Sequence, residues 1–227
     1  MKGDLTTGSI STGLLKFALP LMAGNILQQF YNLADTLIVG RVLGTDALAA
    51  VGSSYTLMTF LTSILIGLCM GSSAFFSMQF GRKKWEVLNK GIFLSFILIG
   101  LLTLILNITV YALLDWIIRS IQVPAELQGM IKDYLLYIFA GIAAVFLYNF
   151  AASLLRSVGN SFAPLMFLGI TVVLNIFLYI FFVMELRWGI RGAAAATVIS
   201  QFVSGIGIVI YTYLCFPMLR IKRIHIH

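Results

Sequence analysis

Charged residues are scarce in this sequence: Asp, Glu, Lys and Arg make up only 10% of its 227 residues, whereas hydrophobic residues make up 60%. The mean hydropathy is +1.02. Soluble domains carry about 25% charged residues, so this balance excludes an ordinary soluble domain and predicts an integral membrane protein. A net charge of +7 could suggest a nucleic-acid partner. However, the basic residues fall between apolar runs, so membrane topology explains them better and we expect no nucleic acid.

The residue types that carry most enzyme chemistry are also rare. The two histidines, His225 and His227, belong to a basic C-terminal segment. Cys69 and Cys215 lie in apolar runs without a CxxC pattern or a neighbouring histidine, which argues against a zinc site or a redox pair. No GxxxxGK[ST] sequence is present to bind nucleotide phosphates. We therefore expect no enzymatic activity, no cofactor, and no metal other than a Na⁺ ion that could serve in transport.

Long apolar runs are what the sequence contains instead. A helix of roughly 20 apolar residues crosses the hydrocarbon core of a bilayer, which is about 30 Å thick. The runs of sufficient length are 15–40, 50–79, 91–114, 134–155, 161–184 and 192–216. This pattern predicts an all-α integral membrane protein in which residues 1–227 form a single six-helix lobe.

The basic residues are unevenly divided between the two sides of the predicted topology, because ten of them fall on one side and five on the other. Cytoplasmic loops of membrane proteins carry an excess of Lys and Arg, so we place both termini and the 80–90 loop in the cytoplasm. We expect a multi-pass protein of the plasma membrane. The ten are Lys2, Lys16, Arg82, Lys83, Lys84, Lys90, Arg156, Arg220, Lys222 and Arg223, and the five are Arg41, Arg119, Lys132, Arg187 and Arg191.

Asp35 is the only acidic residue that we place within a predicted span. A charge at that depth costs about 3 kcal/mol or more, so it normally faces a water-filled cavity or a partner. Polar residues spaced three or four positions apart precede it on the same helical face. They are Asn25, Gln28 and Asn32. This polar stripe predicts an ion or substrate path, with a structural ion pair as the alternative for Asp35. Pro20 predicts a bend near the inner end of the same helix.

Later spans contribute further polar side chains. Tyr137 and Asn149 could line a cavity, although tyrosines near the start of a span are more often interface anchors, and this is the interpretation we prefer for Tyr134. Asn175 shares a helical face with Tyr179, four residues later. Thr197 and Gln201 need polar partners within the bundle. A polar-lined bundle with one titratable group and no nucleotide site is typical of a secondary transporter coupled to H⁺ or Na⁺.

Several stretches resemble the multidrug and toxic compound extrusion (MATE) family. LPLMAGNILQQFYNLADTLIVGRVLGTDALAAVG is similar to the first helix of that family and the turn after it, and LLRSVGNSFAP to its fourth-to-fifth helix junction. VVLNIFLYIFF and WGIRGAAAATVISQ resemble its fifth and sixth helices. The resemblance implies two six-helix lobes around a central cavity, with export of organic cations and other amphipathic compounds in exchange for Na⁺ or H⁺. The chain resembles the amino-terminal lobe.

The resemblance also implies roles for individual residues. Asp35 matches the acid that binds the coupling cation or proton, and Pro20 matches the proline associated with bending of the first helix. Asn175 and Thr197 match polar members of the same cation site. Tyr179 departs from the family pattern, which often has Asp there. A phenol, with an unperturbed pKa near 10, does not supply the charge of a carboxylate, so the site has one acid where some relatives have two.

The expected partners are the lipid bilayer, a small amphipathic or cationic substrate, and either a second six-helix lobe or a second copy of the chain. Transport by alternating access needs two units that move against each other around a site, and six helices supply one of them. Two alternatives remain open: a lipid-precursor flippase of the wider superfamily, or a non-transporting scaffold fragment of a split transporter.

Overall fold

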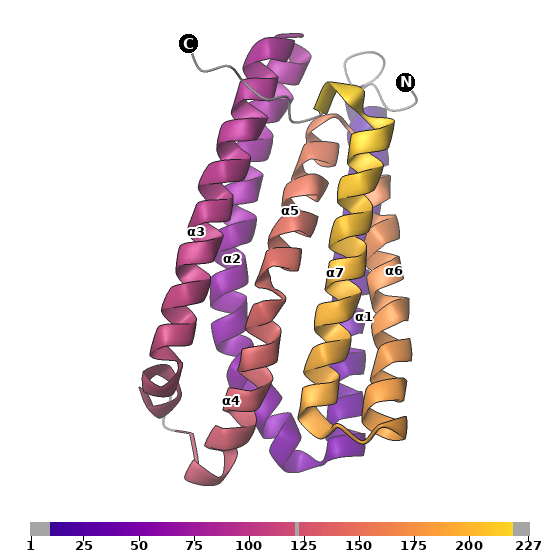
Figure 1. The fold of residues 1–227 in the computed structure, drawn as a ribbon. Helices are drawn as coiled ribbons and strands as arrows, with labels where there is room; N and C mark the ends of the chain where they lie inside the picture. The colour runs from indigo at the N-terminus through magenta and orange to yellow at the C-terminus, as the bar shows by residue number, and fades with distance from the viewer. Residues whose placement is uncertain (1–9, 121–122, 220–227) are drawn as a thin grey trace.

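The computed structural model describes residues 10–120 and 123–219. Every regular element within these residues is helical, and the long helices form one elongated bundle (Figure 1). The elements are α1 (Ile10–Ile38), η1 (Val39–Leu43), α2 (Thr45–Gly81), α3 (Trp85–Ser120), α4 (Ala125–Ala140), α5 (Ile142–Ser157), α6 (Phe162–Tyr179), η2 (Ile180–Glu185), α7 (Gly189–Cys215) and η3 (Pro217–Leu219). The elements η1 and η2 are π-helical turns that extend α1 and α6, and η3 is a short 3-10 turn.

The predicted spans coincide with helices, but one of them is broken. The segment 134–155 belongs to two helices, α4 and α5, which meet at Gly141 with a bend of 42°. Within the described residues, four helices are long and apolar enough to cross a membrane, or five if α4 and α5 count as one span. The first predicted span, 15–40, is not among them. Its helix α1 carries the polar stripe and Gln29, which lower its mean hydropathy.

The connections alternate between the two ends of the bundle. The start of α1, the α2–α3 turn, the α5–α6 turn and the end of α7 lie at one end, as Figure 1 shows. Gly159, in the α5–α6 turn, has φ of 84°, and Gly44, between η1 and α2 at the opposite end, has φ of 90°. Glycine adopts this backbone conformation without steric cost. The alternation agrees with the predicted up-and-down order, and the cytoplasmic assignment of either end stays a prediction.

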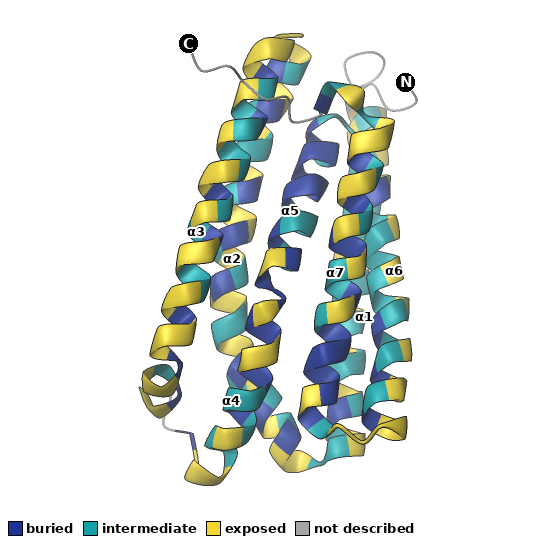
Figure 2. Cartoon of the chain, viewed as in Figure 1, coloured by how far each residue is buried: buried dark blue, intermediate teal, exposed yellow. Residues whose placement is uncertain are grey.

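Helix α5 lies in the interior of the lobe and is its most buried helix (Figure 2). Ala144, Ala152 and Leu155 are fully buried, and Phe150 packs against Phe76 of α2 and Phe96 of α3. In contrast, α3 exposes large apolar side chains along its outer face. These are Leu94, Leu98, Leu101, Leu104, Ile105 and Ile108, each more than half exposed. An apolar outer face of this kind fits contact with lipid.

Candidate functional site

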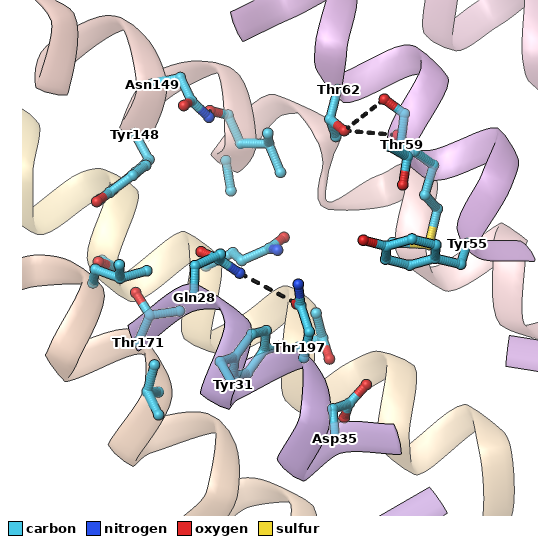
Figure 3. A pocket seen from close by; sticks show the side chains of 18 of the residues that line it. Gln28, Tyr31, Asp35, Tyr55, Thr59, Thr62, Tyr148, Asn149, Thr171 and Thr197 are labelled. Atoms are coloured by element: carbon cyan, nitrogen blue, oxygen red, sulfur yellow. Dashed lines mark hydrogen bonds between the residues drawn. The ribbon is translucent and has the colours of Figure 1, made fainter. Parts of the chain in front are cut away.

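A cavity of about 450 Å³ lies inside the lobe between α1, α2, α4, α5, α6 and α7. This volume is in the range of sites that hold small organic molecules. In Figure 3, Asp35 and Tyr31 project from α1 at one side of the cavity, and Tyr148 and Asn149 project from α5 at another. The wall is rich in uncharged polar groups: Gln28, Gln29, Asn32, Tyr55, Thr59, Thr62, Ser63, Tyr148, Asn149, Thr171, Thr197, Gln201 and Ser204.

Asp35 is the only charged side chain in the part of this wall that the structure describes. Three tyrosines lie close enough to interact electrostatically with its carboxylate: Tyr31 from α1, Tyr134 from α4 and Tyr179 from α6. Tyr134 and Tyr179 are buried, and the Tyr179 Oη has no hydrogen-bond partner among the described residues. No Lys, Arg or His side chain is among the described residues of the wall, so the nearby groups that interact with the carboxylate are phenols and not basic side chains.

Asn175 and Thr197 connect α6 and α7 behind this cluster. Asn175 Nδ2 donates a hydrogen bond to Thr197 Oγ1 at 3.2 Å, and Thr197 Oγ1 in turn donates to the Ala193 carbonyl at 3.2 Å. The Tyr31 hydroxyl also interacts with the Thr197 side chain. The structure thus brings Asp35, Asn175, Tyr179 and Thr197 into one region, supplied by α1, α6 and α7.

The polar stripe of α1 enters the cavity only in part. Gln28 and Asn32 lie in the wall, where Gln28 Nε2 donates to Asn32 Oδ1 at 3.4 Å. Asn25, predicted to line the cavity, is exposed and outside the wall. At this level α1 packs against α6, where a Cβ on Gly24 would lie 3.8 Å from Leu165 Cδ1. The cavity therefore begins one turn beyond Asn25.

The two tyrosines of α4 occupy the opposite positions to those expected. Tyr137, predicted as a cavity residue, is 44% exposed and lies outside the wall, whereas Tyr134, interpreted as an interface anchor, is 4% exposed and lines the cavity. The reason is that α4 begins at Ala125, well before Tyr134, and buries Tyr134, Leu135 and Ile138. This orientation turns Tyr137 outward.

The remaining predicted residues lie where the sequence suggested or close to it. Asn149 and Gln201 line the cavity, and Asn149 Nδ2 also donates to the Val145 carbonyl of its own helix at 2.8 Å. Pro20 lies inside α1, which runs from Ile10 to Ile38, and the bend expected at this residue stays a prediction. Sequence reasoning missed Tyr31, although its spacing of four residues before Asp35 places both side chains on one helical face.

Comparison with known proteins identifies related chains. The family model MatE matches residues 20–181. The chain is 32% identical over 198 residues to the probable multidrug resistance protein YpnP of Bacillus subtilis, covering 87% of this chain and 44% of that protein. It is 29% identical over 203 residues to the probable multidrug resistance protein NorM of Thermotoga maritima, covering 87% of this chain and 43% of that protein.

Solved structures agree with the sequence relatives. A crystal structure of MATE in complex with MaL6 superimposes with a TM-score of 0.91 at 27% identity, covering 98% of this chain and 50% of that chain. The chain therefore spans about half the length of the relatives that it matches. Because the family model covers most of the sequence and the fold agrees, the chain belongs to the MATE family of membrane transporters.

Proposed function

We propose that this lobe acts in the export of small amphipathic or cationic molecules by antiport, with Asp35 as the group that binds the coupling ion. The observation that carries the proposal is the position of Asp35 as the only charged group described in the wall of a 450 Å³ cavity. This single negative charge would attract both a cationic substrate in the cavity and a coupling ion bound to Asp35. The names of two relatives, each called a probable multidrug resistance protein, support the same function.

Coupling requires that the ion and the substrate favour different conformations. Each ligand can shift the equilibrium only by its differential affinity for the two states, at about 1.4 kcal/mol for each factor of ten. Protonation of Asp35 removes the negative charge that attracts an organic cation. Uptake of a proton would therefore weaken the binding of substrate, and release of the proton would restore it.

We propose H⁺ as the coupling ion and Na⁺ as the alternative. The site contains one carboxylate, and the family's second acid is replaced by Tyr179, which stays neutral near pH 7 because a phenol has a pKa of about 10. A proton needs only the Asp35 carboxylate. A Na⁺ ion would use the same carboxylate together with neutral oxygens from side chains such as Asn175 and Thr197.

The assembly that we propose contains this lobe and a second six-helix unit, either another segment of the same protein or a second copy of this chain. The exposed apolar face of α1 is a candidate contact for that unit, because Leu15, Leu19, Met22, Ile26 and Phe30 are each more than half exposed. We propose a location in the plasma membrane with both termini in the cytoplasm, based on the distribution of Lys and Arg.

A lipid-precursor flippase is less favoured. A phosphate-bearing substrate would be bound by Lys or Arg side chains, and the described cavity wall contains neither. A scaffold fragment of a split transporter would show neither substrate binding nor ion-dependent export. These outcomes separate the three functions in one set of measurements.

The test uses ethidium, a fluorescent organic cation, as the probe. The protein is reconstituted in liposomes, and ethidium export is measured with an imposed pH gradient and, separately, with a Na⁺ gradient. Asp35→Asn keeps the size of the side chain but fixes a neutral state, so we expect loss of gradient-driven export. Asp46→Asn is the matched control, because Asp46 is an exposed acid in the first turn of α2 and lies outside the cavity wall. Export by Asp35→Asn at the unmodified rate and with the same pH dependence would refute the proposal.

A further inference from the structure

The membrane span formed by α4 and α5 is interrupted beside the cavity. The two helices differ in direction by 42°. At the break, the Gly141 amide donates to the Ile138 carbonyl at 2.9 Å, which is a spacing of three residues and not the four of an α-helix. A helix end leaves its last carbonyl groups without regular partners, and within a bilayer these groups need donors from protein.

Helix α3 supplies two donors at this end of α4. Asn107 Nδ2 donates to the Phe139 carbonyl at 2.7 Å, and the Tyr111 hydroxyl donates to the Leu136 carbonyl at 2.8 Å. Asn107 and Tyr111 are four residues apart and so share one face of α3. The Tyr111 ring also makes an edge contact with the Phe139 ring, with 6.2 Å between the ring centroids. Two polar side chains of α3 therefore bond to carbonyl groups within the last five residues of α4.

Helix α7 packs against the break from another side. A Cβ on Gly141 would lie 2.9 Å from Val198 Cγ2 and 3.3 Å from Gln201 Oε1. Gln201 is part of the cavity wall. The break is therefore held between α3 and a helix that lines the cavity, and a shift of the break would change the cavity wall.

The two helices that meet at the break contribute to different parts of the site. From α4, Tyr134 lies near Asp35, and from α5, Ala144, Val145 and Tyr148 form another part of the cavity wall. The bend sets the direction of one helix relative to the other. A change in that bend would move Tyr134 relative to Tyr148, and so the Asp35 cluster relative to the cavity.

We propose that Asn107 and Tyr111 are positioning residues that hold the bend between α4 and α5 and thereby keep Tyr134 in place beside Asp35. Neither residue lines the cavity, so both act through the backbone of α4. The inference rests on the proposed function of Asp35 as the coupling group. Hydrogen exchange at the break, the first measurement below, does not depend on that function.

The variants are Asn107→Leu, which keeps a similar size and removes the donor, and Tyr111→Phe, which keeps the ring contact with Phe139 and removes the hydroxyl. The matched control is Thr103→Val, one turn earlier on α3. The Thr103 hydroxyl donates only within its own helix, to the Ile99 carbonyl at 2.7 Å. Tyr111 is 36% exposed, so Tyr111→Phe tests the inference even if Asn107→Leu fails to fold.

The first readout is hydrogen exchange of the backbone amides of residues 141–145, measured by mass spectrometry on the protein in nanodiscs. Water in the cavity can reach this segment when it opens, because Ala144 and Val145 line the wall. Loss of one hydrogen bond is expected to accelerate exchange about three- to tenfold in each variant. Thr103→Val should leave the exchange of these amides unchanged.

The second readout is ethidium binding as a function of pH. We expect both variants to weaken binding about three- to tenfold and to shift its pH midpoint, while the control retains both values. Unchanged exchange at residues 141–145 would overturn the inference that these side chains hold the break. Faster exchange with unchanged affinity and pH midpoint would overturn the positioning role, since the contacts would then serve the fold alone. If the unmodified protein binds no ethidium, the proposed function fails instead, and exchange still decides whether the break is held.

Discussion

The hydroxyl of Tyr179 is a buried polar group whose removal should stabilise the protein. The side chain is 0% exposed, and its Oη has no hydrogen-bond partner among the described residues. A buried hydroxyl without a partner costs about 1–3 kcal/mol. Tyr179→Phe keeps the ring and its packing but removes the unpaired oxygen. We therefore expect the free energy of unfolding of the ion-free variant to rise.

The size of this effect can be measured by thermal unfolding of the purified protein in detergent. For a chain of this length, each kcal/mol corresponds to a shift of roughly 2–4 °C in Tm. Tyr148→Phe is the matched control, because the Tyr148 hydroxyl donates to the Pro164 carbonyl at 2.9 Å. Loss of that bond should lower stability by about 0.5–1.5 kcal/mol. The two substitutions remove the same atom and should change Tm in opposite directions.

Tyr179→Phe should reduce ion-coupled export although it raises stability. Sites that bind ligands often retain polar groups at a cost in stability. If the Tyr179 oxygen helps to hold the coupling ion near Asp35, the variant should be more stable and should couple export less well. A decrease in Tm equal to that of Tyr148→Phe would refute the reasoning, because it would mean that the Tyr179 hydroxyl is paired in the native protein.

The general architecture could be predicted from the sequence because hydropathy reports directly on membrane spans. The runs at 50–79, 91–114, 161–184 and 192–216 are helical in the structure, with ends that differ from the predicted ones by up to six residues. Asp35 stood out for the same reason, since a lone charge in an apolar run is costly. That Asn175, Tyr179 and Thr197 lie near it was implied by resemblance to the family. Spacing could place Asn175 and Tyr179 on one face but could not show which helix they meet.

The details that were not predicted depend on contacts between helices. Hydropathy alone predicts one span over α4 and α5, because an apolar run containing Gly141 is compatible with either a straight or a broken helix. The side chain of Asn107 donates to a backbone carbonyl 32 residues away, a contact that neither hydropathy nor helical spacing reports. The burial of Tyr134 and the exposure of Tyr137 could not be predicted, because the packing of α4 against α2 and α7 sets the rotation of that helix and so decides which ring is buried.

Three further predictions concern packing, topology and ion selectivity. Gly205→Ala should lower stability by about 1–3 kcal/mol, because its Cβ would lie 2.9 Å from the Ala144 carbonyl oxygen, whereas Gly67→Ala, with open space around the new Cβ, should not. Lys84→Cys should resist a membrane-impermeant thiol reagent added outside intact cells, and rapid labelling would contradict the cytoplasmic placement of the α2–α3 turn. Tyr179→Asp would place a second carboxylate beside Asp35. Because two nearby negative charges repel each other, a bound Na⁺ would relieve more repulsion than in the unmodified site. We therefore expect ethidium export by this variant to become more sensitive to a Na⁺ gradient, and an unchanged ratio of Na⁺-driven to H⁺-driven export would show that Tyr179 does not determine the choice of ion.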